Sequence, residues 1–394
     1  MKFILTSCWF PPTKIIGGVI ESCYRTSVSL VDLGHDVTVI CTDAGQSGRS
    51  GDKEFNEIKK NGLKIVTCRK FLNERYGATL EIYKIFTAIK ARPDVVVSFE
   101  LFSCIAITSM IFAYLLKVPY ILFPRGALMP NALLISSTKK KIFMTIIGDF
   151  LLDKASCIIG TSKYEKSAIY ETLKTKDTCV DVIENGCYRF DFHKDFNVTE
   201  LDDMLDGCED RKIILYLNRL SKEKGLERLI LAWKNLQSDI ENSVLVIAGD
   251  GDASIVEWLK KEIAHNKLKN QILFIGPVFG DVKWHLLSRS DIFILPSTTE
   301  NFGNVVVESL MSKTPVIATK GTPWSELNDF NCGVWVDNNI FGIEYGIKMM
   351  LSYTAQEIGV MGENGRELVL SKYTWEKTAK KIIARSEFIT NTDL

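Results

Sequence analysis

The sequence predicts an α/β protein built from two doubly wound domains in series. Short runs rich in Val, Ile and Leu alternate with longer stretches of helical periodicity along most of the chain. Because the short runs are apolar on both faces, they are typical of parallel strands covered by helices. The alternation stops at the acidic, polar residues 187–210 and then restarts, which indicates a linker. A chain of 394 residues is long enough for two ordinary domains.

The first domain is placed at residues 1–190 and the second at 205–372. In the first, the patterns predict strands at 3–7, 37–41, 64–68, 95–99, 120–123, 157–160 and 180–183, and helices at 18–33, 80–90, 103–116, 139–153 and 163–173. In the second, they predict strands at 213–217, 244–247, 272–275, 292–295, 315–318 and 333–336, and helices at 226–236, 255–266, 282–287, 304–311 and 340–351. Two such sheets are expected to face each other across a cleft, where ligands commonly bind. Residues 373–394 read as an amphipathic helix that begins near Thr374 and is free to pack back on the first domain.

Composition narrows the class of protein. The 48 basic and 48 acidic residues cancel, so no overall field attracts nucleic acid, and no nucleic-acid partner is expected. The ten cysteines occur singly, many in apolar runs, which favours free thiols in a reducing, cytoplasmic setting. The four histidines (His35, His193, His265 and His285) are far apart, and neither a metal nor another cofactor is expected.

Residues 291–313 give the most specific signal. An apolar strand pattern at 292–295 is followed by a polar turn and then by a helix that opens at Gly303-Asn304. A helix that begins at the carboxyl edge of a parallel sheet presents backbone N–H groups to a phosphate. Glu300 precedes this helix and Glu308 lies inside it, and carboxylates accept paired hydrogen bonds from sugar hydroxyls. The stretch therefore predicts a ligand with a sugar, a diphosphate and a nucleoside in a row.

Further residues fit the same ligand. Arg219 lies just past a predicted strand and Lys224 opens the next helix, so both cations suit a diphosphate. Gly249 marks a second phosphate-type turn. In the first domain, Gly17 and Gly18 open a helix after the first strand, but the G-x-G-x-x-G spacing of a dinucleotide-binding domain is missing, which weakens an NAD-dependent alternative.

Each of these features also has a purely structural explanation. Glu308 fits an exposed helix position, and Glu300 is a favourable acid at a helix N-terminus. Arg219 and Lys224 fit solvated loop charges, and a glycine pair is common in strand-to-helix turns. The joint pattern is much more specific than any single residue.

The joint pattern resembles the retaining GT-B glycosyltransferases of family 4. Residues 296–309, PSTTENFGNVVVES, resemble the E-x7-E signature of that family. Other segments fall in the expected order: GG at 17–18, ENG at 184–186, NRLSKEKG at 218–225, AGDG at 248–251, GPV at 276–278 and TPVIA at 314–318. PRGAL at 124–128 and GTPW at 321–324 resemble a subgroup found in bacterial surface-polysaccharide assembly. The resemblance covers nearly the whole chain and implies the GT-B fold, with two Rossmann-like domains.

The resemblance also implies roles for individual residues. Glu300 would contact donor-sugar hydroxyls, Glu308 the ribose, and backbone near Val278 the base. Arg219, Lys224 and the helix N-terminus would stabilise the leaving diphosphate without a metal. The leaving phosphate itself would assist deprotonation of the acceptor, so no separate general base is required. The remaining expected substrate-binding residues are Gly17, Gly18, Asn185, Gly249, Asn301, Phe302, Gly303, Asn304 and Val305.

Arg125 departs from the family pattern. Many members carry His at this position near the donor sugar, and an Arg stays charged and cannot act as a neutral acceptor. We include Arg125 among the catalytic residues, where it would neutralise phosphate or bind a polar sugar substituent. A structural arginine at a strand end is the alternative.

The sequence therefore predicts a retaining glycosyltransferase that uses a UDP- or GDP-sugar in bacterial polysaccharide, lipopolysaccharide or capsule synthesis. The acceptor, a glycan or a lipid-linked oligosaccharide, is expected near Gly17, Glu100 and Arg125. Residues 139–143 offer a peripheral membrane contact at the inner face of the membrane, or a solvated helix start. A sugar-nucleotide epimerase or phosphorylase of the same fold and a non-catalytic sugar-nucleotide-binding protein are the alternatives.

Overall fold

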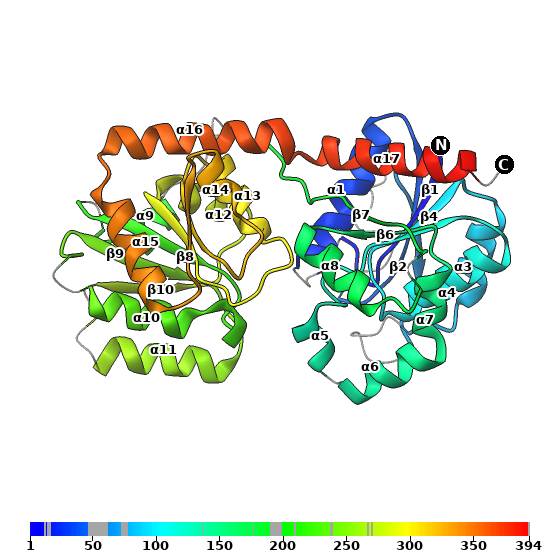
Figure 1. The fold of residues 1–394 in the computed structure, drawn as a ribbon, viewed down its shortest axis with the longest axis horizontal. Helices are drawn as coiled ribbons and strands as arrows, with labels where there is room; N and C mark the ends of the chain where they lie inside the picture. The colour runs from blue at the N-terminus through cyan, green and yellow to red at the C-terminus, as the bar shows by residue number, and fades with distance from the viewer. Residues whose placement is uncertain are drawn as a thin grey trace. The chain divides into compact units, whose positions relative to one another are not determined.

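The computed structural model describes residues 1–11, 13, 17–45, 62–71, 78–135, 137–175, 177–189, 199–208, 210–236, 239–265, 268 and 271–392. Its internal contacts divide the chain into unit 1 (Met1–Gly186 with Trp375–Leu394) and unit 2 (Cys187–Thr374). Each unit has one parallel sheet with helices on it, as Figure 1 shows, so the predicted fold class of two Rossmann-like domains is confirmed.

Unit 1 contains, among its described residues, a seven-stranded parallel sheet in the order β3-β2-β1-β4-β5-β6-β7. The strands are β1 (Lys2–Thr6), β2 (Asp36–Thr42), β3 (Lys64–Cys68), β4 (Val95–Ser98), β5 (Tyr120–Leu122), β6 (Cys157–Gly160) and β7 (Val180–Val182). The chain runs outward from β1 in one direction to β3 and then returns to β4 on the other side of β1. This reversal makes β1/β4 the topological switch point, where open α/β sheets bind ligands at the carboxyl edge.

Helices cover both faces of this sheet. They are α1 (Gly18–Asp32), α3 (Ile82–Lys90), α4 (Cys104–Leu115), α5 (Pro130–Leu134), α6 (Ser137–Phe143), the π-helical turn η2 (Met144–Gly148), α7 (Asp149–Asp153), α8 (Lys163–Thr172) and α17 (Trp375–Thr392). Alternate residues of β1 enter different cores: Ile4 packs with α4 and α8, whereas Leu5 packs with α1 and α17. The C-terminal helix α17 thus belongs to unit 1, where it lies against α1.

Unit 2 repeats the plan with six parallel strands among its described residues, in the order β10-β9-β8-β11-β12-β13. The strands are β8 (Lys212–Leu217), β9 (Ser243–Ala248), β10 (Ile272–Gly276), β11 (Ile292–Leu295), β12 (Val316–Thr319) and β13 (Gly333–Val336). Its switch point is β8/β11. The side chains of β8, β9, β11 and β12 are almost all buried, which explains why these strands read as unbroken apolar runs.

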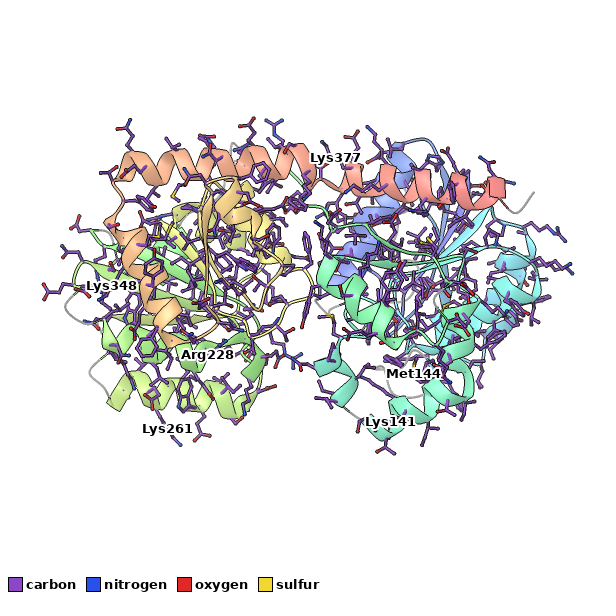
Figure 2. All side chains as sticks on the ribbon, in the orientation of Figure 1. Lys141, Met144, Arg228, Lys261, Lys348 and Lys377 are labelled. Carbon is purple, nitrogen blue, oxygen red and sulfur yellow. The ribbon has the colours of Figure 1, made fainter. Side chains whose placement is uncertain are left out.

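The helical elements of unit 2 also form two layers. They are α9 (Thr199–Met204), the 3-10 turn η3 (Lys222–Lys224), α10 (Leu226–Asn235), α11 (Ala253–His265), α12 (Gly280–Arg289), α13 (Asn304–Met311), α14 (Glu326–Asp329), α15 (Ile340–Ser352) and α16 (Ala355–Lys372). One core contains residues of α12, α13 and α16, and the other contains residues of α10, α11 and α15. Side chains fill the space between sheet and helices in both units (Figure 2).

The helices depart from the sequence expectation in several places, among them the short helices α5 and α14, which were not predicted. Helix α9 lies within residues 187–210, which the composition assigned to a linker, and belongs to unit 2. The single helix expected at 139–153 is interrupted by the π-helical turn η2. Helix α16 was not predicted because glycines dilute its pattern. A Cβ at Gly362 would lie 2.2 Å from the Lys313 carbonyl oxygen, so glycine there allows α16 to pack closely.

Candidate functional site

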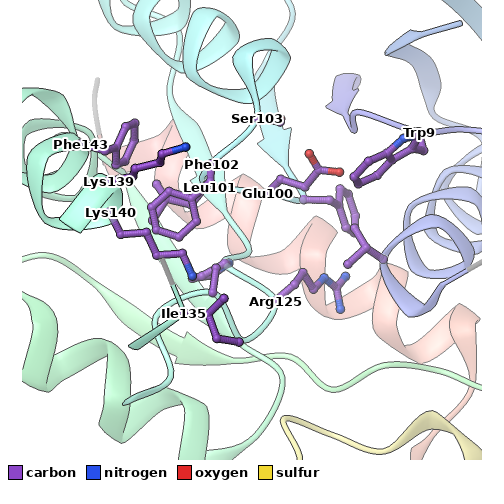
Figure 3. A pocket seen from close by; sticks show the side chains of 14 residues that line it. Trp9, Glu100, Leu101, Phe102, Ser103, Arg125, Ile135, Lys139, Lys140 and Phe143 are labelled. Atoms are coloured by element: carbon purple, nitrogen blue, oxygen red, sulfur yellow. The ribbon is translucent and has the colours of Figure 1, made fainter. Parts of the chain in front are cut away.

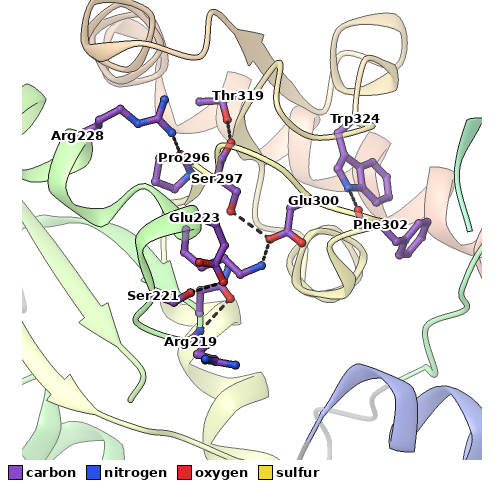
Figure 4. A network of polar contacts seen from close by, with 12 residues as sticks. Arg219, Ser221, Glu223, Arg228, Pro296, Ser297, Glu300, Phe302, Thr319 and Trp324 are labelled. Carbon is purple, nitrogen blue, oxygen red and sulfur yellow. Dashed lines mark hydrogen bonds and ion pairs between the residues drawn. The ribbon is translucent and has the colours of Figure 1, made fainter. Parts of the chain in front are cut away.

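The switch point of unit 2 holds a buried ion pair. Lys224 ends η3, which follows β8, and Glu300 lies in the turn that follows β11. The Lys224 Nζ lies 2.6 Å from Glu300 Oε1, and the two side chains are only 18% and 11% exposed. Ser297 Oγ donates to the same oxygen over 3.1 Å (Figure 4). Because both charges are largely removed from water, their interaction is stronger than that of a surface pair.

Hydrogen bonds from neighbouring elements hold the turn that carries Glu300. The Thr298 backbone N–H donates to the Glu223 carbonyl oxygen over 2.7 Å, which ties the turn to η3. Arg228, at the start of α10, donates through Nη2 to the Pro296 carbonyl oxygen over 2.7 Å (Figure 4). The two loops of the switch point are therefore joined through their backbones as well as through the ion pair.

Glu308 has a different cation. It lies in α13, and its Oε1 is 2.7 Å from the Nζ of Lys283 in α12. In the described residues, the Oε2 atoms of Glu308 and Glu300 accept no hydrogen bond. Each glutamate thus uses one oxygen for a protein cation and keeps the other available to a ligand hydroxyl.

Arg219 is far more exposed than Lys224. Its side chain is 68% exposed and its Nη2 lies 3.6 Å from Asp252 Oδ1, a contact that contributes little to stability. An exposed cation with one weak ion pair at the end of β8 can reorient toward a phosphate at small energetic cost.

The N-terminus of α13 lies next to Glu300 in the chain. Gly303 has a φ of +84° and precedes the first helical residue, and no side chain of the described residues caps the helix. Such a terminus leaves backbone N–H groups and the positive end of the helix dipole for an anion. Phe302 is buried against Trp324 and Tyr373, and Trp324 Nε1 donates to the Phe302 carbonyl oxygen over 2.5 Å. This packing fixes the direction in which the helix begins.

Some of the other predicted residues of unit 2 are explained by packing, and one has a buried polar atom without a hydrogen-bond partner among the described residues. Gly249 follows β9 with a φ of +145°, and a Cβ there would lie 1.9 Å from the Asn218 carbonyl oxygen, so the packing itself requires glycine. Val278 is buried after β10, and Val305 packs partly buried against the core. Asn301 has a buried Oδ1 without a hydrogen-bond partner among the described residues. Asn304 is the first residue of α13.

In unit 1, Arg125 follows β5 and is held from several sides. Its guanidinium lies 4.8 Å from the ring centroid of Phe99 and 4.7 Å from that of Phe123, and Nη1 donates to Asn185 Oδ1. Its φ of +54° is a left-handed conformation that a non-glycine residue rarely adopts. Burial lowers the pKa of Arg125 to about 10, and the nearby carboxylate of Glu165 opposes this shift. The guanidinium therefore keeps its charge at neutral pH.

Glu100 lies at the switch point of unit 1, two residues after β4. Its Oε1 accepts from Ser7 Oγ over 3.2 Å and from the Cys8 backbone N–H over 3.0 Å, and both donors follow β1. Burial raises the pKa of Glu100 above its usual value, and these hydrogen bonds offset only part of the shift.

Packing against the described residues of unit 1 does not require glycine at position 17, at the start of α1. Gly17 has a φ of 179°, which any residue adopts, and a Cβ there would meet no atom of the described residues within 4 Å. Gly18 begins the helix itself.

The structure thus brings the predicted residues together in separate groups. Lys224 meets Glu300, and Arg125 meets Asn185, whereas Glu308 pairs with Lys283, which sequence reasoning missed. Nothing in the local pattern around Lys283 indicates its partner, because the pair joins neighbouring helices through the fold.

A second missed residue is Glu165, which is fully buried beneath the loop that carries Arg125. Its Oε1 accepts from the Gly126 backbone N–H over 2.5 Å, and its Oε2 accepts from Thr161 Oγ1 over 2.8 Å. The pattern Ser162-x-x-Glu165 at the start of α8 was a visible helix-capping signal. It did not reveal that the carboxylate also fixes the neighbouring loop.

Two further findings bear on cofactors and membranes. Among the described residues, no group of three or more His, Cys, Asp or Glu side chains is placed to hold a metal ion. All ten cysteines lie in that part of the chain and are free thiols. No helix of the described ranges is long and apolar enough to cross a membrane.

Comparisons with known proteins define the class. Residues 17–186 match the family model described as glycosyl transferase 4-like domain, and residues 200–368 match the one described as glycosyl transferases group 1. Together the two matches span most of the chain, which is therefore a GT-B glycosyltransferase of the hexosyltransferase type.

Individual relatives agree with this assignment. An uncharacterized glycosyltransferase of Methanocaldococcus jannaschii is 25% identical over 97% of both chains. The alpha-monoglucosyldiacylglycerol synthase of Streptococcus pneumoniae is 24% identical over 96% of this chain and 82% of its own. The crystal structure of Anabaena HepE in complex with UDP and glucose has a TM-score of 0.74 at 17% identity, with both chains fully covered. The last similarity concerns the fold.

Proposed function

We propose that this glycosyltransferase moves a sugar from a UDP- or GDP-sugar bound by unit 2 to a glycan or lipid-linked acceptor bound by unit 1. The observation that carries the proposal is the switch point of unit 2, where Glu300, Lys224 and the start of α13 gather between β8 and β11. A carboxylate, a cation and a helix N-terminus suit the sugar and the diphosphate of one donor. The complex of HepE with UDP and glucose supports a donor of this kind.

The proposed chemistry follows from these groups. When the anomeric C–O bond breaks, negative charge develops on the leaving diphosphate. Arg219, Lys224 and the α13 N-terminus stabilise that charge, since fixed dipoles and cations act strongly in a site with little water. Glu300 Oε2 accepts from a donor-sugar hydroxyl and Glu308 Oε2 from the ribose. The similarity to family 4 favours retention of anomeric configuration, with the leaving phosphate taking the acceptor proton.

The first test is a thermal-shift panel of nucleotide sugars. A donor at one hundred times its dissociation constant stabilises the folded protein by about 2.7 kcal/mol. For a domain of this size, that corresponds to a rise in Tm of roughly 5–10 °C. We expect the sugars of one nucleotide base to give the largest rise in Tm. If no UDP- or GDP-sugar raises the Tm, the proposal is contradicted.

Turnover separates the proposal from its alternatives. Sugar transfer that needs an acceptor supports a transferase, whereas UDP release with an epimerised sugar and no acceptor identifies an epimerase. Binding without any turnover identifies a non-catalytic sugar-nucleotide-binding protein. Retention is checked from the anomeric configuration of the product by NMR, and transfer that is unchanged in EDTA supports a metal-independent reaction.

We further propose that unit 1 contacts the inner face of the bacterial membrane during surface-polysaccharide, lipopolysaccharide or capsule synthesis. Leu134, Ile142 and Ile146 are exposed on the segment that carries Lys139 and Lys141. Exposed apolar side chains beside cations favour the surface of an anionic bilayer. The lipid product named for the Streptococcus pneumoniae relative agrees with an acceptor of this kind.

Vesicle sedimentation tests this contact. We expect the protein to bind vesicles that contain anionic lipid and to bind neutral vesicles less. The double variant Ile142→Ser/Ile146→Ser should bind both anionic and neutral vesicles less than the unmodified protein does. If the variant binds vesicles as well as the unmodified protein, the proposed membrane contact is contradicted.

A further inference from the structure

Unit 1 contains a cavity of about 560 Å³ that begins at its switch point. Trp9 and Glu100, which follow β1 and β4, line one part of it together with Arg125. Lys139, Lys140 and Phe143 of α6 line another part (Figure 3). The cavity therefore extends from the carboxyl edge of the sheet to the helical segment that precedes η2.

The part near the sheet carries unused hydrogen-bond donors. Arg125 Nε and Nη2 and Trp9 Nε1 are buried and have no hydrogen-bond partner among the described residues. The guanidinium cannot turn away, because it lies on the rings of Phe99 and Phe123. Buried donors without partners are rare in native proteins, so this part of the cavity is suited to a ligand with acceptor oxygens. Burial raises the pKa of Glu100 in the same part above its usual value, and its carboxyl group is suited to hydrogen bonds with a hydroxyl group.

The part near α6 is cationic and apolar. Lys139 has no ion pair within the described ranges, and Lys140 lies 5.2 Å from the ring centroid of Phe102. Phe102, Phe143 and Ile135 supply apolar surface beside these charges (Figure 3). Ile135 is 61% exposed at the cavity edge, so the apolar surface continues to the outside. A cation next to open apolar surface suits a phosphate joined to a hydrocarbon chain.

We propose that this cavity binds an acceptor in which a sugar is joined through phosphate to a hydrocarbon chain. The sugar lies against Trp9, Glu100 and Arg125, whose donors bind its oxygens. The phosphate lies beside Lys139, and the chain runs over Phe143 and Ile135 to the outside. This inference rests on the proposed function and names the acceptor class of the same enzyme.

The test measures binding by the full chain without any nucleotide sugar. The probes are dodecyl glucosyl phosphate, dodecyl glucoside and glucose 1-phosphate, each titrated by calorimetry below the micelle concentration. We expect the first to bind at least about tenfold more tightly than the second, which lacks the phosphate, and than the third, which lacks the chain. Equal binding of dodecyl glucoside and dodecyl glucosyl phosphate overturns the phosphate assignment. If glucose 1-phosphate binds as tightly as dodecyl glucosyl phosphate, the cavity binds a free sugar phosphate, and the proposal is also overturned.

Variants localise the phosphate. Lys139→Gln should weaken dodecyl glucosyl phosphate about tenfold and leave dodecyl glucoside unchanged. The matched control is Lys141→Gln, since Lys141 is an exposed neighbour on α6 that does not line the cavity (Figure 2). Equal effects of the two substitutions contradict the site. Nucleotide-sugar binding by the same preparations reports on unit 2, so a failure of the proposed donor site is distinguished from a failure of the acceptor cavity.

Discussion

Replacement of Glu300 by Gln tests both the stability and the catalytic importance of the ion pair in unit 2. The substitution removes the charge that faces Lys224 Nζ at 2.6 Å while keeping the size of the side chain. Because these side chains are only 11% and 18% exposed, the ammonium group loses its main compensation in a largely buried place. A charged hydrogen bond of this kind contributes about 1.5–3 kcal/mol. We therefore expect the melting transition of unit 2 to fall by roughly 3–12 °C.

The same substitution is expected to slow sugar transfer. If Glu300 Oε2 accepts from a donor-sugar hydroxyl in the transition state, loss of the charge costs about 1.5–3 kcal/mol there. This corresponds to a fall in kcat/KM of roughly 10- to 150-fold. The assay follows release of the nucleoside diphosphate at substrate concentrations far below KM.

A double variant separates the two effects. Lys224→Met added to Glu300→Gln removes the uncompensated ammonium, so part of the lost Tm should return while transfer stays slow. The exposed pair of Lys320 and Asp337 is a matched control, because its N–O distance is also 2.6 Å but its side chains are 50% and 64% exposed. Asp337→Asn should change Tm by no more than about 2–4 °C, because an exposed pair contributes at most about 1 kcal/mol. The reasoning is refuted if Glu300→Gln leaves transfer unchanged, or if the double variant regains transfer.

Four other substitutions give separate expectations. Glu308→Gln should raise the donor KM about tenfold with kcat nearly unchanged, because a ribose contact is equal in the ground and transition states; steady-state kinetics with a fall in kcat alone would contradict this. Gly249→Ala should lower Tm by at least about 6 °C, since its Cβ would lie 1.9 Å from the Asn218 carbonyl oxygen, whereas Gly17→Ala should leave Tm unchanged. Glu100→Gln should destabilise the protein most at acidic pH. Burial raises the folded-state pKa of this acid, so wild-type stability falls as pH rises from the unfolded pKa of about 4.3 toward the folded value. The difference in Tm between wild type and variant should therefore shrink between pH 4 and pH 7, and a difference that grows with pH would contradict the assignment.

The strands were predictable because the physics that forms them is local. Runs such as 95–99 and 292–295 are apolar on both faces, and a parallel sheet covered by helices is the structure that buries both faces. Helix α16 escaped prediction although Thr354 and Glu357 form a capping box at its start. Its glycines lower helix propensity. The reason for one of them, the close approach of Gly362 to the Lys313 carbonyl oxygen, exists only in the folded unit.

The candidate site was predictable only in part. The order of Arg219, Lys224, Glu300 and Glu308 along the chain indicated a sugar-nucleotide site. The first three lie in loops that follow strands at one sheet edge, and Glu308 lies inside the helix that comes after Glu300. The partner of each carboxylate was not predictable. Lys283 reaches Glu308 from another helix, and such pairing depends on helix packing rather than on sequence spacing.

The two units place a glutamate at the same point of the same fold and give it different partners. In unit 1, Glu100 follows β4 and accepts from the neutral groups of Ser7 and Cys8, which follow β1. In unit 2, Glu300 follows β11 and pairs with Lys224, which follows β8. Burial raises the pKa of Glu100 above its usual value, and the hydrogen bonds to its carboxylate oppose part of that shift. The switch point of unit 1 is therefore suited to exchange hydrogen bonds with the hydroxyl groups of an acceptor substrate. The switch point of unit 2 places a charged hydrogen-bond acceptor, Glu300, beside a cation, Lys224. A sugar attached to a diphosphate requires both groups.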